Sequence, residues 1–262
     1  MEYVQLIRNF LFIFSAAQIK RLLPGSKMAK WWKYYYHELS RSGRHDARQA
    51  AFFIALFSSM GRLSKIDGRV TEREIAKAQA IMANMRLGTD QKRLAIGLFN
   101  EGKQPEFDLD AVLVRYRHIC RHELALSQLF LEILLQMALA DGDINVPEMK
   151  LLTRIRWRLG YSLSRFKKLE IRVRSDEKLR QLEGLRTPDS SMLLEEAFEV
   201  LGVSPGASQG EITQAYRRLL SSHHPDKLAS KNLPAEILAM ATEKTRDIKK
   251  AYGLISQTWK AK

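Results

Sequence analysis

The chain has 262 residues, of which 45% are hydrophobic, and this is enough for one to three domains with sizeable cores. Lysine and arginine number 43 against 29 acidic residues. The net charge of +14 favours an acidic partner: nucleic acid, anionic lipid or an acidic protein surface. The single Cys120 excludes an intramolecular disulfide and lies among apolar residues, so we expect a buried, inert thiol in a reducing compartment. No cleavage site of small residues follows the apolar start of the chain, so we expect no secretory signal.

Residues 1–44 predict an apolar and basic anchor segment. The uncharged stretch at 9–19 is shorter than the roughly 20 residues that a membrane-spanning helix needs. A cationic amphipathic anchor is the alternative, because one helical stripe is apolar: Leu6, Phe10, Ile13, Phe14 and Ala17. Residues 27–36 alternate lysines with aromatic side chains, which suits a lipid headgroup layer. The other interpretation is an ordinary helix packed on the next domain.

Residues 45–165 predict a helical domain, because helical periodicity dominates and no convincing strand appears. The segments 67–74 and 141–148 are two copies of one pattern, with Asp, Gly, a β-branched residue and a final Glu in the same register. Each copy predicts a turn at Gly followed by a new helix, with Thr71 or Asn145 as its cap.

The repeat has two interpretations. It imitates the second half of a calcium-binding EF-hand loop, but apolar or basic residues occupy the positions that should supply the other carboxylates. The pattern also resembles TerB, a helical domain associated with tellurite resistance. That resemblance implies a weak metal site if the two copies meet in space, with four candidate ligands: Asp67, Glu74, Asp141 and Glu148. We favour the alternative that these acids cap helix N-termini and interact with the helix dipoles.

Residues 166–189 predict a basic linker. Positive charge is concentrated there and just before it, at Arg154, Arg156, Arg158, Arg165, Lys167, Lys168, Arg172 and Arg174. Apolar residues among these indicate packed helix for part of the run, while residues 175–190 predict a tether. A charge run of this kind is most often a solvated face. A membrane surface is the functional alternative, and nucleic acid is the third choice.

Residues 190–262 predict a short helix followed by an antiparallel pair of helices. Ser208 and Glu211 have the spacing of a capping box that starts the second helix. Pro225 ends that helix, because proline disfavours a helical conformation at the preceding residue. Pro234 then opens the third helix. The loop between the two long helices carries three residues at its tip: His224, Pro225 and Asp226.

With its neighbours in register, this tripeptide resembles the J domain of the DnaJ co-chaperone family. The neighbours are Leu-Gly-Val at 201–203, Ala-Tyr-Arg-Arg-Leu at 215–219 and Ile-Lys-Lys-Ala-Tyr at 248–252. The form His-Pro-Asp-Lys-Leu at 224–228 resembles the DjlA type of co-chaperone in particular. The resemblance implies that the loop and the basic second helix dock on a DnaK-type chaperone and stimulate its ATPase.

The resemblance also implies roles for single residues. His224 and Asp226 trigger the partner, and Pro225 stiffens the turn that presents Asp226. The residues that position the partner are Tyr216, Arg217, Arg218 and Lys227. The two arginines can make forked hydrogen bonds to carboxylates on a partner. Thr213 and Gln214 stand where the family usually has basic residues, which shortens the positive patch here.

Together these features predict an all-α protein with a TerB-like bundle followed by a J-domain hairpin. It would be a regulatory co-chaperone that performs no chemistry and needs no cofactor. The family pattern implies the inner membrane, with the soluble domains facing the cytoplasm, and a peripheral or cytoplasmic location is the alternative. A basic nucleic-acid-binding or membrane-surface adaptor is the rival function, although no nucleic-acid-binding motif accompanies the basic run. The sequence leaves open whether the middle domain forms a homodimer.

Overall fold

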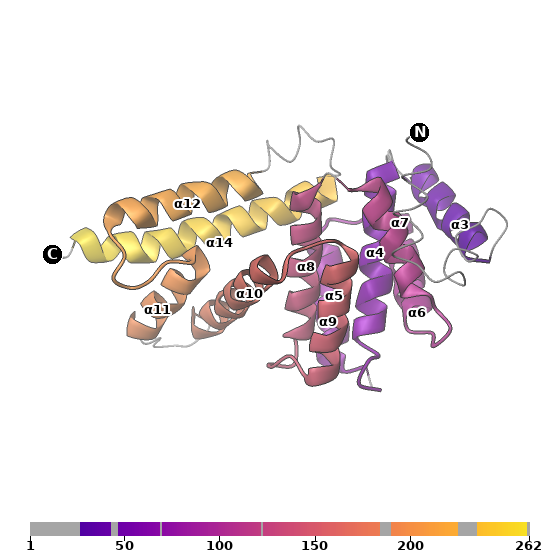
Figure 1. The fold of residues 1–262 in the computed structure, drawn as a ribbon, viewed down its shortest axis with the longest axis horizontal. Coiled ribbons are helices and arrows are strands. Elements are labelled where there is room, and N and C mark those ends of the chain that lie inside the picture. Colours follow the sequence, from indigo (N-terminus) through magenta and orange to yellow (C-terminus); the bar gives the residue numbers. More distant parts are fainter. Residues whose placement is uncertain are drawn as a thin grey trace, which may run out of the picture.

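The computed structural model describes residues 27–42, 47–68, 70–121, 123–183, 190–224 and 235–260. The regular elements in these ranges are α-helices, which confirms the all-α prediction (Figure 1). In chain order they are α3 (Lys27–Ser42), α4 (Ala47–Leu63), α5 (Glu72–Asn84), α6 (Thr89–Gly102), α7 (Leu109–Ile119), α8 (Leu124–Ala138), α9 (Val146–Arg158), α10 (Leu163–Glu183), α11 (Ser190–Leu201), α12 (Gln209–His223) and α14 (Ala235–Lys260).

Helix α4 lies at the centre of what we call the N-terminal bundle, which consists of α3 to α9. No charged residue occurs between Arg48 and Arg62, and a helix that is apolar on all sides is buried by its neighbours. Helices α3, α6, α7 and α8 pack around it. The backbones of α4 and α6 are in contact, because a Cβ atom added at Gly61 would lie 1.9 Å from the carbonyl oxygen of Phe99.

The two repeated segments form matching turns that lead into α5 and α9. Gly68 and Gly142 have φ values of 101° and 113°, a left-handed conformation that glycine adopts without steric cost. Each following helix starts with a capping box, formed by Thr71 with Glu74 and by Asn145 with Glu148. The turns and caps that the repeat predicts are therefore present in both copies.

Helix α3 is packed on the bundle. Its residues Trp32, Tyr35 and Leu39 are buried in the same core as α4. The ring of Trp31 lies edge-on to that of Phe107, with centroids 5.2 Å apart. The hypothesis that these aromatic residues suit a headgroup layer is therefore wrong for the buried ones, and the alternative of a packed helix holds for α3. The predicted amphipathic stripe at Leu6 to Ala17 lies outside the described residues.

Helix α10 replaces most of the predicted tether. It continues to Glu183 and buries Ser175, Asp176, Leu179 and Leu182. The sequence prediction fails here because the helix has no clear apolar stripe. Several charged residues on its packed side have charged partners on other helices. Residues 184–189 lie outside the described residues.

Helices α11, α12 and α14 form a second unit, and α12 and α14 lie side by side as the sequence predicts (Figure 1). Their core contains Ala197, Val200, Ile212, Leu219 and Ile248, with further apolar residues around them. We call α12 and α14 the hairpin. Leu179 of α10 also belongs to this core, so α10 packs against both units.

Candidate partner-binding site

Helix α12 of the hairpin is the element that leads into the predicted loop. Helix α12 starts at a capping box in which the carboxylate of Glu211 accepts a hydrogen bond from the Ser208 amide at 2.8 Å. The helix ends at His223, and His224 is extended, with φ −63° and ψ 126°. This agrees with the prediction that Pro225 stops the helix. Three predicted site residues lie outside the described residues: Pro225, Asp226 and Lys227.

The three predicted site residues on α12 differ in their exposure. Tyr216 is half-buried and stacks on Tyr252 of α14, with ring centroids 4.2 Å apart and an interplanar angle of 17°. Such contact makes Tyr216 part of the packing between the two helices. Arg217 and Arg218 are exposed. Arg217 also lines a shallow hollow with Gln209, Gly210, Thr213 and Gln214 on the same helix.

His223, the residue before the predicted tripeptide, is buried against the N-terminal bundle, and its side chain is only 5% exposed. Its Nε2 atom lies 3.3 Å from Oε1 of Glu132 on α8, and its Nδ1 atom lies 2.9 Å from the carbonyl oxygen of Leu219. On α14, the hydroxyl of Thr245 donates to the carbonyl oxygen of His223 at 3.1 Å. The last residue of α12 is therefore held by both α8 and α14.

Glu132 is the acidic partner of this histidine and is 2% exposed. It also accepts a short hydrogen bond from Arg172 of α10. Burial alone would raise the pKa of Glu132, but the contact with His223 and the positive charges of Arg172 and Lys244 hold the pKa of this carboxylate far below the ordinary value. Sequence analysis missed this group. Its only signal was a lone carboxylate in the apolar helix α8.

Two more ion pairs connect α10 to α14. Lys244 pairs with Asp176, and both residues are 4% exposed. Arg180 pairs with Asp247 at 2.5 Å. Asp176 and Arg180 follow Arg172 at intervals of four residues, so the three side chains lie along one face of α10. Met240 and Ala241 of α14 belong to the core of the N-terminal bundle, so apolar contact accompanies these pairs.

The two repeated turns meet, because the hydroxyl of Thr71 donates to Oδ2 of Asp141 at 2.9 Å. Burial raises the pKa of Glu74, and the nearby carboxylates of Asp67 and Asp141 raise it further. Burial also raises the pKa of Glu148, and the carboxylates of Glu74, Asp67 and Asp141 add to that effect. Both glutamates accept backbone hydrogen bonds as helix caps, which is the role favoured on sequence grounds.

The weak metal site predicted from these acids gains no support from their arrangement. Among the residues that the structure describes, no three His, Cys, Asp or Glu side chains are grouped so as to hold a metal ion. The described hydrogen bonds account for Glu74 and Glu148 through helix capping.

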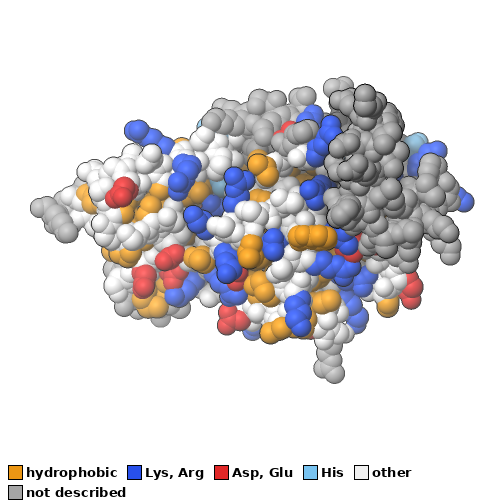
Figure 2. All heavy atoms as spheres, in the orientation of Figure 1, with side chains coloured by type: hydrophobic (Ala, Val, Ile, Leu, Met, Phe, Trp, Pro, Cys, Tyr) orange, Lys and Arg blue, Asp and Glu red, His pale blue; other side chains and the backbone are white. Residues whose placement is uncertain are grey.

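Much of the basic run is paired inside the molecule. Arg154 and Arg158 both bond to the buried carboxylate of Asp110, and Arg174 pairs with Glu170 and Asp143. Three cations of the run are exposed on α10: Arg165, Lys167 and Lys168. Figure 2 shows Lys and Arg side chains spread over one face of the molecule, with hydrophobic side chains between them. The prediction of packed helix for part of the run is therefore confirmed, and the solvated-face interpretation applies only to the exposed cations.

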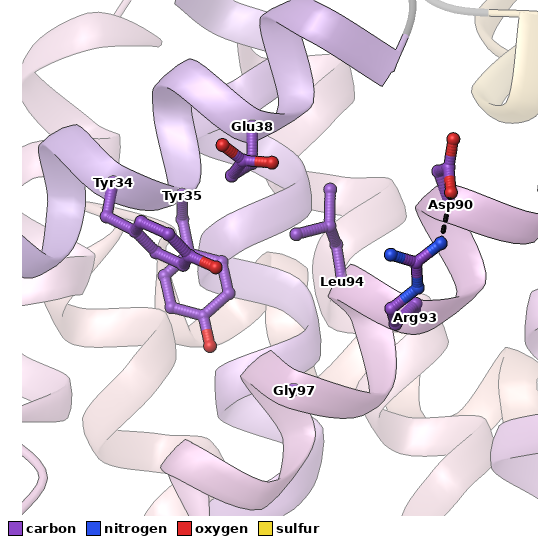
Figure 3. Close-up of a pocket in the computed structure, with 7 residues that line it drawn as sticks. All are labelled: Tyr34, Tyr35, Glu38, Asp90, Arg93, Leu94 and Gly97. Carbon is purple, nitrogen blue, oxygen red and sulfur yellow. Dashed lines mark hydrogen bonds and ion pairs between the residues drawn. The ribbon is translucent and has the colours of Figure 1, made fainter.

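A hollow between α3 and α6 is lined by Tyr34, Tyr35, Glu38, Asp90, Arg93, Leu94 and Gly97 (Figure 3). Arg93 and Asp90 form an exposed ion pair at one side of it. Burial, with Glu101 nearby, raises the pKa of Tyr35 to about 12, so this phenol stays protonated and is not a base at neutral pH. The geometry favours packing between the two helices.

Cys120 is buried, as the sequence predicts.

Two family profiles match the chain in order. Residues 53–171 match the family described as tellurite resistance protein TerB, and residues 196–262 match the DnaJ domain. These matches fall on the N-terminal bundle with the start of α10, and on the second unit. No solved structure matches the chain significantly.

Curated proteins named "Co-chaperone protein DjlA" are similar to most of the chain. The one from Coxiella burnetii is 43% identical over 205 residues, which covers 78% of this chain and 76% of that protein. The one from Vibrio cholerae is 40% identical over 224 residues, with 79% and 78% covered. The one from Legionella pneumophila is 36% identical over 242 residues, with 85% and 81% covered. With a TerB domain followed by a C-terminal DnaJ domain, the chain belongs to the DjlA family of DnaJ-type co-chaperones.

Proposed function

We propose that this co-chaperone binds a DnaK-type chaperone through the loop after α12 and stimulates its ATPase. The observation that carries the proposal is the hairpin itself. Helix α12 stops at His223, His224 leaves it in an extended conformation, and Arg217 and Arg218 are exposed on the same helix. A partner that approaches α12 therefore meets two guanidinium groups about two turns before the loop.

The chemistry of these groups suits an acidic protein surface. Guanidinium groups form forked hydrogen bonds with carboxylates, and exposed cations steer an acidic partner toward the site. We propose that Asp226 and His224 trigger hydrolysis, that Pro225 stiffens the turn, and that Arg217, Arg218 and Lys227 orient the partner. Tyr216 contributes by joining α12 to α14. In this proposal the bond-breaking chemistry belongs to the chaperone, and this protein is not an enzyme.

The test is the steady-state ATPase rate of a DnaK-type chaperone with the full chain added. We expect His224→Gln to reduce stimulation to the basal rate, because the trigger is altered while the cores are untouched. Lys167→Gln is the matched control, since it changes an exposed residue of α10 far along the chain from the hairpin, and it should stimulate like the wild type. Unchanged stimulation by His224→Gln would show that the proposal is wrong.

We also propose that the protein works at a membrane surface, the cytoplasmic face of the inner membrane, with attachment through its N-terminal segment. The support is the apolar run at residues 10–17 with basic residues on both sides. The described helices include none that is both long and apolar enough to cross a membrane. Helix α3 packs in the bundle, so the proposal assigns attachment to residues 1–26.

The rival function of nucleic-acid binding is not favoured by any specific contact. Arg154, Arg158, Arg172 and Arg174 have acidic partners within the chain. Side chains that are paired in this way are less available for phosphate contacts.

A further inference from the structure

We propose that the TerB domain positions the partner-binding loop of the DnaJ domain, and that Glu132 and Arg172 are the positioning residues. This inference rests on the proposed function, since its readout is stimulation of the chaperone. Three groups of paired side chains connect α8, α10 and the hairpin, and we call them the clamp: His223–Glu132–Arg172, Asp176–Lys244 and Arg180–Asp247.

The clamp acts at the residue next to the loop. His223 is adjacent to His224, and its ring and carbonyl oxygen are both held. The ring lies against Glu132 of the TerB domain, and the carbonyl accepts from Thr245 of α14. Fixing the last residue of α12 at two points restricts the direction in which the chain leaves that helix. A TerB side chain thereby fixes the last residue of α12, which lies 91 residues later in the sequence.

The burial of the clamp favours a positional role over a purely stabilising one. Two charges removed from water recover little net free energy when they pair, and apolar residues of the same size would often stabilise a fold as well. Paired charges do favour one register, because any shift leaves a charge buried without its partner. Asp176, Glu132 and Lys244 are each at most 4% exposed, so the cost of a shift applies to all three.

The alternating signs along α10 strengthen this argument. Arg172, Asp176 and Arg180 present positive, negative and positive charge on one face. Their partners outside α10 carry the opposite signs in the matching order: Glu132, Lys244 and Asp247. Sliding the hairpin along α10 by one helical turn would place like charges together. One docked position is therefore favoured over its neighbours.

The side of α12 that would face the partner is exposed while the clamp contacts are formed. Arg217 and Arg218 are exposed, and none of the clamp contacts involves them. A chaperone can therefore bind this face without opening the clamp. The clamp accordingly holds the hairpin ready for binding and does not cover it.

The test compares two buried acids in the full chain. Glu132→Gln removes the charge that holds His223. Asp110→Asn removes another buried acid, which lies on α7 and binds Arg154 and Arg158 of α9. We expect Glu132→Gln to lower maximal ATPase stimulation about tenfold, because a hydrogen bond to a charged group contributes on that scale. The chaperone concentration at half-maximal stimulation should change less, since Arg217 and Arg218 are untouched. Asp110→Asn should stimulate like the wild type.

A second measurement keeps the test valid if Glu132→Gln folds poorly. Spin labels at the exposed positions Lys150 and Gln257 report the distance between the TerB domain and the end of α14. The wild type should give one narrow distance distribution, and Asp176→Lys or Lys244→Asp alone should broaden it and reduce stimulation. The double exchange Asp176→Lys with Lys244→Asp should restore both, because the pair is re-formed with its signs reversed.

The outcomes distinguish the positioning role of the clamp from the proposed function. A broadened distance distribution with unchanged ATPase stimulation in the single exchanges would overturn the positioning role. Increased stimulation would also overturn it, because the clamp would then inhibit stimulation. A narrow distribution in the single exchanges would show that the clamp does not hold the hairpin. If the wild type itself fails to stimulate, the proposed function is wrong, and the label distances alone decide whether the clamp exists.

Discussion

Glu132 and Glu74 are both buried glutamates, yet their pKa values shift in opposite directions. Burial raises the pKa of Glu74, and the negative charges of Asp67 and Asp141 add to that effect. Burial also acts on Glu132, but the positive groups around it reverse the effect and lower its pKa. The immediate neighbours, rather than burial itself, decide the sign. Ionised Glu132 therefore stabilises the fold above the pKa of an unfolded glutamate. Glu74 stabilises the fold more in its protonated form, at lower pH.

The free energy of unfolding should reflect this difference. A carboxyl whose pKa is lowered by folding contributes stability above its unfolded pKa of about 4.3, and this is lost as pH falls toward the folded pKa. Glu132→Gln should therefore cost roughly 3–5 kcal/mol at pH 7 and progressively less below about pH 4. Urea denaturation of wild type and variant across this range measures the difference.

Glu74→Gln is the matched control for that measurement. Glutamine at this position can still complete the capping box, so the substitution removes only the charge. Because the pKa of Glu74 is raised, its charge is unfavourable at neutral pH, and the variant should be at least as stable as the wild type there. This advantage should disappear on acidification. A cost of Glu132→Gln that is independent of pH would contradict the assignment.

At the scale of elements, α10 is the helix that both domains share. Phe166, Leu169 and Val173 are buried in the core of the N-terminal bundle, while Leu179 lies in the core of the second unit. Asp176 and Arg180 form their ion pairs with α14 from the same half as Leu179. The second half of α10 therefore packs with the DnaJ domain.

This packing predicts that a fragment of residues 190–262 is less stable than one of residues 175–262. The longer fragment retains Leu179, whose burial contributes about 1.5–3 kcal/mol. Denaturation of the two fragments in urea measures the difference. The longer fragment with Leu179→Ala should lose most of its advantage. Equal stability of the two unaltered fragments would show that α10 contributes nothing to this core.

At the scale of the whole molecule, the net charge of +14 comes from basic residues in two settings. Some of them are paired with buried acids, and others are exposed on the surface. Several arginines of the basic run connect helices through the buried acids Asp110 and Glu132. The proposal assigns membrane attachment to the N-terminal segment, and Arg165, Lys167 and Lys168 are exposed cations of the described part of the chain. The proposed membrane attachment and the internal pairing of charges therefore rest on different residues.

We expect the full chain to float with vesicles that contain anionic lipid, and a chain lacking residues 1–26 to remain in solution. The reason is that the apolar residues proposed as the anchor lie in that segment, while basic residues alone give a weak, salt-sensitive attraction. Vesicles of neutral lipid are the control. Equal flotation of the shortened chain would assign attachment to the described domains instead.

Local patterns predicted a large part of this protein. The capping box of Ser208 and Glu211 and the stop before Pro225 depend on residues close together in the chain, and the structure contains both at α12. The repeated turns at Gly68 and Gly142 are equally local. The family and the all-α class followed from such patterns. Hydrogen-bond spacing and backbone sterics act within a few residues, so a sequence displays them directly.

The sequence by itself determined the all-α class, several helix caps, the repeat and the exposed arginines of α12. Only the tertiary structure decided which face of α3 is buried, how far α10 extends, and that His223 lies against Glu132. The physical reason is distance along the chain. A buried charge requires a partner, but the partner lies 91 residues away, and no local pattern identifies it until the helices have packed.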